Sequence, residues 1–264
     1  LSSAASDVYK RQMYGYVTDG LYQVSDFDYD EATKTYTLKD GVPYSGKKTD
    51  VKPGMWKFKN VDGSEDNKIT ENDKTVIGNA YPKFYGGINN TFTYKDFDLS
   101  IFLTYSFGND VFNATKLTNT KTALQNKNVL DIANSSNRWV VVNKKGELIT
   151  DPQEMADINK GKTVAAVYDN EIGDTYIHSW AVEDGSYLKL SNITLGYTFP
   201  RKMLSKIGIS KLRLYATGSN LLTWTKYSGF DPEVSTMGSG LTPGVDFGAY
   251  PKSRSFVFGI NLAF

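Results

Sequence analysis

Apolar and polar positions alternate from Tyr81 to Phe107, and the alternation predicts a β-hairpin. Successive side chains of a strand point to opposite faces, so segments 84–94 and 97–107 each have one face rich in aromatic and aliphatic residues. Lys95 and Asp96 form the turn between them. Each strand has about 11 residues, which at ~3.3 Å per residue and a tilt of ~45° rise roughly 25 Å. This is the height of the apolar band of a membrane-spanning β-barrel.

Three later segments alternate in the same way. They are Ser186–Pro200, Lys211–Leu222 and residues 253–264. Aromatic residues stand at both ends of the first hairpin, with Phe84 and Phe107 at one end and Tyr94 and Phe97 at the other. Such pairs match the two aromatic girdles of a transmembrane barrel. A soluble β-sandwich also alternates, but the strand length and the paired girdles favour the membrane.

Short and long connections also alternate along the chain. The turns at 95–96 and 200–210 are short, whereas segments 108–185 and 223–254 are long. Transmembrane barrels have short periplasmic turns and long extracellular loops. We therefore predict an all-β fold, the C-terminal part of an antiparallel transmembrane β-barrel with about five long strands and long extracellular loops. The barrel would be incomplete, since the smallest barrels have about eight strands.

The remaining segments have weaker patterns. Thr35–Lys39 and Val42–Tyr44 predict a small hairpin around an Asp-Gly turn. Asp110–Ala133 lacks Gly and Pro and predicts one or two short helices, and 134–184 is typical of an exposed loop. No secretory signal opens the chain. Because a barrel must be exported, either the true N-terminus is missing or the membrane interpretation is wrong. We expect residues 1–12 to be a non-native leader and 13–264 to be the barrel segment.

Composition excludes several classes of function. The 264 residues include 30 basic and 29 acidic side chains, so net charge gives no argument for a nucleic-acid partner. The absence of Cys excludes disulfides, thiolate metal sites and Cys nucleophiles. No run of ~18 apolar residues predicts a transmembrane helix. Aromatic residues make up 14% of the chain, which suits interface belts or loops that contact carbohydrate.

One local motif carries chemistry of its own. Oxygen-bearing residues recur after Asp62 with the spacing of an EF-hand-type Ca²⁺ loop, in which hard oxygen ligands converge on one cation. The candidate metal ligands are Asp62, Ser64, Asp66, Lys68 through its carbonyl, Thr70 and Asp73. Asn67 stands where such loops have Gly, and Asp73 where they have a bidentate Glu. The alternative is an acidic turn held by its own side-chain hydrogen bonds.

Enzymatic chemistry has little support. The one histidine, His178, has Ser179 beside it and Asp174 four residues before it. Neither a nucleophile elbow nor an oxyanion-hole motif accompanies them, so we expect a loop histidine and no enzyme.

Several motifs together resemble the SusC/RagA-like TonB-linked outer-membrane proteins, a branch of the TonB-dependent receptors. The motifs are GYVTDG at Gly15–Gly20, the run Asp62–Phe102, FGNDVFNATK at Phe107–Lys116, SYLKLSNITLGYTFP at Ser186–Pro200, SNLLTWTKYSGFDPE at Ser219–Glu233 and the terminal Phe264. The resemblance covers nearly all of 13–264. It implies a C-terminal barrel segment in the outer membrane of a Gram-negative, Bacteroidota-like bacterium.

The same resemblance implies nutrient import. The expected cargo is an oligosaccharide or peptide, and the expected partners are outer-membrane lipid, a SusD-like lipoprotein lid, and TonB through a missing N-terminal part. The family's substrate contacts are spread over its plug and loops, so no residue is assigned as a substrate ligand. Two alternatives stay open: a passive structural or adhesive outer-membrane barrel, and a soluble carbohydrate-binding β-protein whose Trp224 and Tyr227 stack on sugars.

Overall fold

The computed structural model describes residues 12–121, 128–166, 177–233 and 243–264. The chain divides into two compact units, one made of Leu1–Asn79 and Phe112–Val182 and the other of Ala80–Val111 and Glu183–Phe264. Of the predicted leader, residues 1–11 lie outside the described part, and Gln12 already begins a strand. The leader therefore stays a prediction.

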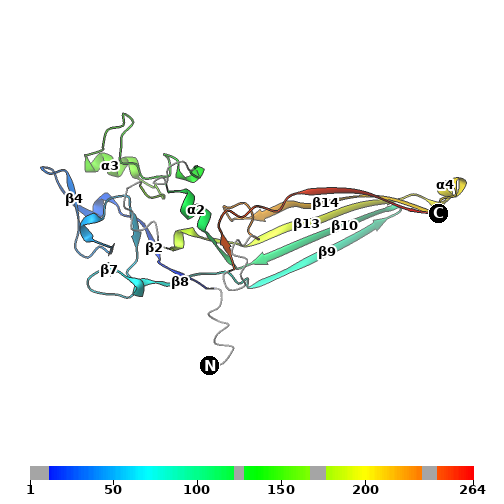
Figure 1. The fold of residues 1–264 in the computed structure, drawn as a ribbon, viewed down its shortest axis with the longest axis horizontal. Coiled ribbons are helices and arrows are strands. Elements are labelled where there is room, and N and C mark those ends of the chain that lie inside the picture. Colours follow the sequence, from blue (N-terminus) through cyan, green and yellow to red (C-terminus); the bar gives the residue numbers. More distant parts are fainter. Residues whose placement is uncertain (1–11, 122–127, 167–176, 234–242) are drawn as a thin grey trace, which may run out of the picture. The chain divides into compact units, whose positions relative to one another are not determined.

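The second unit contains one long antiparallel sheet (Figure 1). Its strands are β9 (Phe84–Tyr94), β10 (Phe97–Phe107), β13 (Tyr187–Thr198), β14 (Lys211–Thr225) and β16 (Ser255–Ala263). They lie in the order β16-β14-β13-β10-β9, so β9 and β16 are at opposite edges. This confirms the predicted hairpin at its predicted bounds, and it confirms an antiparallel, incomplete barrel of five long strands.

The short connections of this unit are tight turns. Between β9 and β10, Lys95 adopts a left-handed conformation with φ of 53°. Between β13 and β14 lie a helical turn, α4 (Arg201–Leu204), and a 3₁₀ turn, η7 (Ser205–Ile207). The predicted helical turn after Pro200 is confirmed.

Three short strands, β11 (Asp110–Asn113), β12 (Val182–Asp184) and β15 (Val245–Asp246), form a small sheet in the order β12-β11-β15.

The first unit is built from short strand pairs and single helical turns. The pairs are β1 (Gln12–Gly15) with β8 (Thr75–Asn79), β2 (Thr18–Leu21) with β6 (Trp56–Phe58), β3 (Phe27–Asp30) with β4 (Thr35–Leu38), and β5 (Tyr44–Ser45) with β7 (Lys68–Ile69). Its helices are α2 (Ala114–Asn119) and α3 (Pro152–Asn159), and its 3₁₀ turns are η1 (Val24–Asp26), η2 (Lys48–Asp50), η3 (Glu71–Asp73), η4 (Asp131–Ala133) and η6 (Ser179–Ala181).

The predicted hairpin of Thr35–Lys39 with Val42–Tyr44 is wrong. Strand β4 at 35–38 pairs instead with β3, which precedes it in the sequence. The Asp30 carboxylate accepts hydrogen bonds from the backbone N–H groups of Ala32 and Thr33 and so closes the turn between β3 and β4. Tyr44 instead pairs in parallel with Lys68. The helices predicted in 110–133 are confirmed in part as α2 and η4, whereas 110–113 is strand β11 and 122–127 lie outside the described residues.

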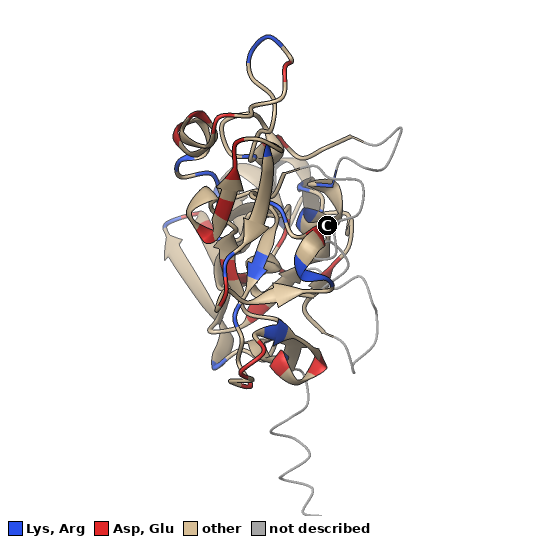
Figure 2. Ribbon diagram, turned by 90° about the vertical axis from the view of Figure 1, so that its left-hand side faces the viewer, with Lys and Arg blue, Asp and Glu red and all other residues tan. Residues whose placement is uncertain are grey.

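The first unit holds the aromatic core of the protein. Two clusters of buried side chains lie within it, one around Trp56, Phe58 and Trp139 and the other around Tyr22 and Phe27. In the view of Figure 2, acidic and basic residues are interspersed rather than separated by sign. No helix among the described residues is long and apolar enough to cross a membrane.

Candidate functional site

The strand register divides the long sheet into an apolar face and a polar face. Residues opposite one another in neighbouring strands share a face, so a single row can be followed across all five strands. One such row of the apolar face runs Phe92, Leu99, Leu195, Ala216, Phe258. The adjacent residue of each strand gives the polar row Thr91, Ser100, Thr194, Thr217, Val257. The alternation predicted from the sequence therefore holds across the whole sheet.

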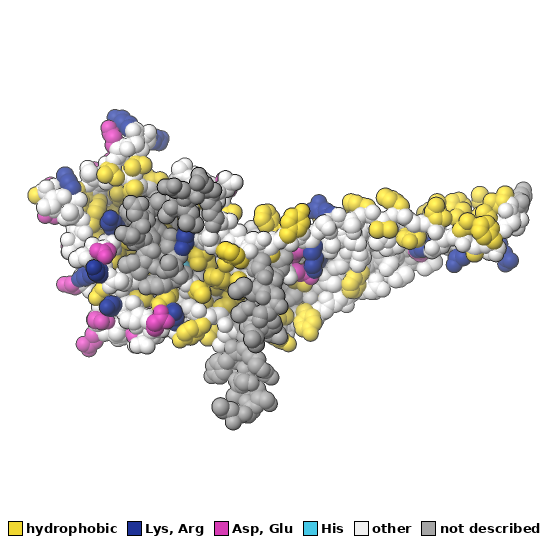
Figure 3. All heavy atoms as spheres, in the orientation of Figure 1, with side chains coloured by type: hydrophobic (Ala, Val, Ile, Leu, Met, Phe, Trp, Pro, Cys, Tyr) yellow, Lys and Arg dark blue, Asp and Glu magenta, His cyan; other side chains and the backbone are white. Residues whose placement is uncertain are grey.

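The apolar face of this sheet is not buried, unlike that of a sheet in a water-soluble protein. The apolar face is exposed, with Phe258 at 79%, Ile260 at 69% and Leu195 at 51%. Within the five strands, the buried residues are polar or Gly: Ser106, Lys189, Gly196 and Gly218. A soluble sheet packs its apolar face into a core, but no layer of the described chain covers this one. Figure 3 shows hydrophobic side chains at the surface along the sheet.

Aromatic rings mark both ends of the apolar face. At the end with short turns, the rings of Phe97 and Tyr197 lie 4.7 Å apart between centroids, and Phe199 continues the group. At the other end, Phe84 and Phe107 lie 5.3 Å apart. The rings predicted as two girdles therefore lie at the two ends of the strands.

An ion pair crosses the polar face from β10 to β14. Arg213 donates from Nε to Asp98 Oδ1 at 3.0 Å and from Nη2 to Asp98 Oδ2 at 2.5 Å. Because β13 lies between these strands, the two side chains meet above Gly196. A Cβ atom on residue 196 would lie 2.4 Å from Arg213 Nη2, so any larger residue there would displace this pair.

Uncharged hydroxyl and amide groups cover much of the remaining polar face. Pairs of side chains hydrogen-bond between neighbouring strands, and the oxygen atoms of Thr194 and Thr217 lie 2.9 Å apart. Further pairs are Ser219 with Asn192, Thr104 with Ser191, and Ser100 with Asn89. A wall of this kind hydrogen-bonds to water or to a polar solute, which suits the inner side of a channel.

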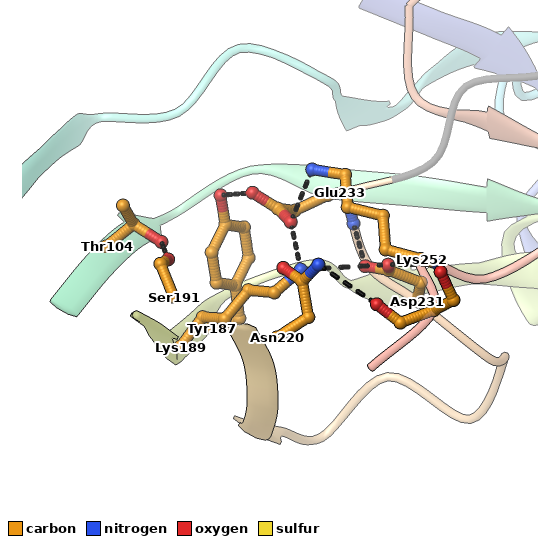
Figure 4. A network of polar contacts seen from close by, with 9 residues as sticks. Thr104, Tyr187, Lys189, Ser191, Asn220, Asp231, Glu233 and Lys252 are labelled. Atoms are coloured by element: carbon orange, nitrogen blue, oxygen red, sulfur yellow. Dashed lines mark hydrogen bonds and ion pairs between the residues drawn. The ribbon is translucent and has the colours of Figure 1, made fainter. Parts of the chain in front are cut away.

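At the loop end of the polar face, a buried lysine fastens the connection between β14 and β16 (Figure 4). The Lys189 ammonium lies 2.5 Å from Glu233 Oε2 and 3.9 Å from Asp231 Oδ2, and the lysine side chain is 3% exposed. Glu233 also accepts hydrogen bonds from Tyr187 at 2.8 Å and from Lys252 at 2.8 Å. Two cations thus balance two carboxylates, which makes burial of the lysine tolerable.

The Glu233 carboxyl group is ionised within this network. Burial alone would raise the pKa of its carboxyl group, but hydrogen bonds from Lys189, Lys252 and Tyr187 favour the charged form and lower the pKa to about 2. The Glu233 carboxylate therefore keeps its negative charge near neutral pH.

The carboxylates predicted to bind Ca²⁺ accept hydrogen bonds from the backbone N–H groups of their own loop. Asp73 is fully buried, and its Oδ1 accepts from the backbone of Val61 at 2.8 Å and of Asp62 at 3.3 Å, while Oδ2 accepts from Thr70 N at 2.8 Å. Backbone donors therefore engage both oxygens of the residue expected at the last ligand position.

Two further predicted ligands are engaged in the same way. Asp62 accepts from Ser64 N at 2.9 Å and Asp66 from Lys68 N at 3.1 Å. Asn67 is left-handed with φ of 53°, as the predicted loop required. Across the described residues, no group of three or more His, Cys, Asp or Glu side chains is arranged to hold a metal ion. Calcium binding by this loop stays a prediction.

His178 is a core residue rather than the expected loop residue. It is fully buried against Trp56 and Phe58, and its Nδ1 lies 2.8 Å from Thr18 Oγ1. Burial, with a smaller contribution from Lys121, lowers the pKa of its ring to about 3. The aromatic enclosure keeps the imidazole neutral and away from solvent.

Sequence patterns alone did not identify the two ion-pair systems of the polar face. Their signal is an isolated charge within an otherwise uncharged strand, as at Asp98, Lys189 and Arg213. The partners of these charges lie far away in the sequence, so local patterns do not pair them.

Comparisons with known proteins agree with this geometry. The chain is 33% identical over 256 residues to the TonB-dependent receptor P3 of Formosa agariphila, covering 95% of the chain and 22% of the relative. It is 27% identical over 209 residues to the TonB-dependent receptor SusC of Bacteroides thetaiotaomicron, covering 77% of the chain and 17% of the relative. No family model matches the chain.

A solved structure of the RagAB peptide transporter has the same fold. It aligns with a TM-score of 0.61 at 20% identity, over 96% of this chain and 22% of that one. The chain thus spans about a fifth of the length of the relatives it matches. These relatives are named as receptors and transporters, in agreement with the expectation that the protein is not an enzyme.

Proposed function

We propose that this chain, as a member of the SusC/RagA-like TonB-dependent receptors, forms part of the barrel wall of an outer-membrane nutrient importer. The apolar face would contact the acyl chains of the outer membrane, and the polar face would line the lumen. The long connections would lie outside the cell and the short turns in the periplasm.

The observation that carries this proposal is the exposed apolar face. Five strands spaced ~4.8 Å apart, with about ten residues each at ~3.3 Å, make a face of roughly 800 Å². The largest apolar patch of a typical soluble monomer covers only ~300–600 Å². Acyl chains remove the cost of hydrating this face, because they are as apolar as the side chains themselves.

The cargo and the partners follow from the same premise. We propose an oligosaccharide or a peptide as cargo, because a wall of hydroxyl and amide groups offers both donors and acceptors to a polar solute. A SusD-like lipoprotein would cover the extracellular end. TonB would act through a part of the full-length receptor that this chain does not contain.

Single-cysteine labelling tests the assignment of the two faces. The chain has no Cys, so Leu99→Cys and Phe258→Cys place one reporter each on the apolar face, and Thr194→Cys and Thr217→Cys do so on the polar face. In lipid bilayers, a polarity-sensitive dye on the first pair should be quenched by lipid-borne quenchers. The same dye on the second pair should be quenched by aqueous iodide.

Each competing function predicts a different outcome. Equal access of iodide to both faces would contradict the barrel-wall assignment. A chain that folds in buffer without detergent would favour the soluble carbohydrate-binding protein. Uptake by the full-length receptor that continues after deletion of TonB would favour a passive barrel over an importer.

A further inference from the structure

The turn between β13 and β14 has an apolar and basic surface of its own. We call it the turn surface, and it consists of Lys95, Arg201, Lys202, Met203, Ile207 and Lys211. Hydrogen bonds bring these residues together, because Thr198 N donates to Asp96 O beside Lys95, and Phe199 N donates to Leu212 O beside Lys211. Leu204 is buried and fixes the turn, whereas Met203 is 62% and Ile207 66% exposed.

The four cations of the turn surface are exposed, and no described acidic side chain neutralises them. Lys95, Arg201, Lys202 and Lys211 form no ion pair within the described residues. The Lys95 ammonium lies 5.3 Å from the centroid of the Tyr94 ring, which leaves its charge unbalanced. Asp96 is the one acidic residue in segments 94–97 and 199–212. The surface therefore carries a net positive charge.

The turn surface directly adjoins the end of the apolar face, and this position indicates what it contacts. The aromatic group of Tyr94, Phe97, Tyr197 and Phe199 ends the apolar face at this side. Arg201 follows Phe199 by two residues, so the turn begins where the apolar band stops. In Figure 3, hydrophobic and basic side chains lie together at the α4 end of the sheet.

We propose that the turn surface docks on the anionic phospholipid headgroups of the bilayer leaflet that surrounds the short-turn end of the sheet. Met203 and Ile207 enter the headgroup–acyl boundary, and the four cations bind lipid phosphates. This inference rests on the proposed function, because it places the apolar face in a bilayer. Charge complementarity and continuity with that face both select lipid as the occupant.

Electrostatics gives the size of the effect. A basic residue near an anionic membrane surface contributes about 1 kcal/mol, which is about a fivefold change in affinity. Replacing Arg201 and Lys202 with Gln should therefore weaken anionic-lipid binding about 25-fold. Raising the salt from ~0.1 M to ~1 M shortens the screening length from about 10 Å to 3 Å and should remove most of the difference. Lys226→Gln changes an exposed lysine just past the opposite end of β14 and is the matched control.

The experiment places a polarity-sensitive dye on Met203→Cys or Ile207→Cys in the full chain, with Ser205→Cys as the control on the same turn and Leu99→Cys as the reporter of the apolar face. Bilayers of phosphatidylcholine alone are compared with bilayers that are about one-third phosphatidylglycerol. The dyes at 203 and 207 should shift to the blue when the anionic lipid is present. The Arg201→Gln, Lys202→Gln variant should lose this shift, and Lys226→Gln should keep it.

The outcomes separate this inference from the proposed function. If Leu99 reports lipid while positions 203 and 207 respond equally in both bilayers, the docking surface is overturned and the barrel wall stands. If Leu99 reports water, the barrel wall fails and the docking surface fails with it. A blue shift at 203 and 207 that persists in the double Gln variant would also overturn the role of the cations.

Discussion

Replacement of Gly196 by Ala should destabilise the sheet only while the ion pair above it is present. The added Cβ would lie 2.4 Å from Arg213 Nη2 and 2.5 and 2.6 Å from the two oxygens of Asp98. Contacts this short require the two side chains to move, which disturbs the ion pair. The backbone itself accepts Ala, because Gly196 is a strand residue and is not among the glycines with positive φ.

Two opposing terms determine the magnitude. Charge-assisted hydrogen bonds contribute about 1.5–3 kcal/mol when shielded. The side chains of Arg213 and Asp98 are 22% and 31% exposed, so solvent screening lowers the value of the pair to roughly 1–2 kcal/mol. Ala in place of Gly within a strand returns about 0.5–1 kcal/mol. Gly196→Ala should therefore lower the free energy of unfolding by roughly 1 kcal/mol in the native background.

The sign should reverse when the ion pair is absent. In the Asp98→Ala, Arg213→Ala background, the new methyl group meets no charged side chain, and Gly196→Ala should stabilise the chain by about 0.5–1 kcal/mol. Urea unfolding in detergent micelles, followed by circular dichroism, measures both backgrounds and gives the coupling between the sites. The same change in unfolding free energy in both would refute the steric argument.

Three further predictions concern other parts of the chain. Ile101→Arg should cost roughly 2–4 kcal/mol of stability in lipid if it lies near the bilayer midplane, whereas Thr194→Arg on the polar face should cost much less, and equal costs would contradict the assignment of the faces. His178 has a pKa of about 3 in the fold, below its unfolded value, so its contribution to stability is complete above ~6.5 and falls by roughly 1.4 kcal/mol per pH unit below that. Unfolding between pH 7 and 5 should show this slope, and His178→Asn should abolish it, since the chain has one histidine. If the loop at 60–75 binds Ca²⁺, EGTA should alter its digestion by protease, and identical digestion patterns would end that prediction.

The sequence predicted the sheet well because alternation is a local property. The bounds of β9 and β10 follow from the apolar positions on either side of Lys95-Asp96. Where a bulge intervenes, as between Leu190 and Asn192, local alternation gives the faces but not the shift in register. In the first unit the strands have two to five residues, and Tyr44 pairs with Lys68 rather than with its neighbours, so distant contacts decide the fold there.

The polar contacts were beyond prediction for a different reason. Lys189 and Glu233 are 44 residues apart and Asp98 and Arg213 are 115 apart, so pairing depends on the order of the strands. The loop after Asp62 was predicted from spacing alone. Spacing does not distinguish carboxylates that converge on a cation from carboxylates that accept the loop's own N–H groups, and Asp73 does the latter.

The distribution of charged residues on the sheet indicates whether lipid or water contacts each face. The five strands contain four charged residues, and by register and alternation all of them lie on the polar face: Asp98, Lys189, Lys211 and Arg213. A soluble sheet also keeps charges off one face, but that face is then covered by other parts of the protein. Here the face without charges is exposed, and three of the four charges on the other face are paired, since Asp98 binds Arg213 and Lys189 binds Glu233. A charge on a lipid-contacting face costs roughly 2–4 kcal/mol at the midplane, whereas one on a hydrated face costs little. The proposed bilayer contact accounts for a surface that is both exposed and free of charge, and neither a soluble sandwich nor a buried core does so.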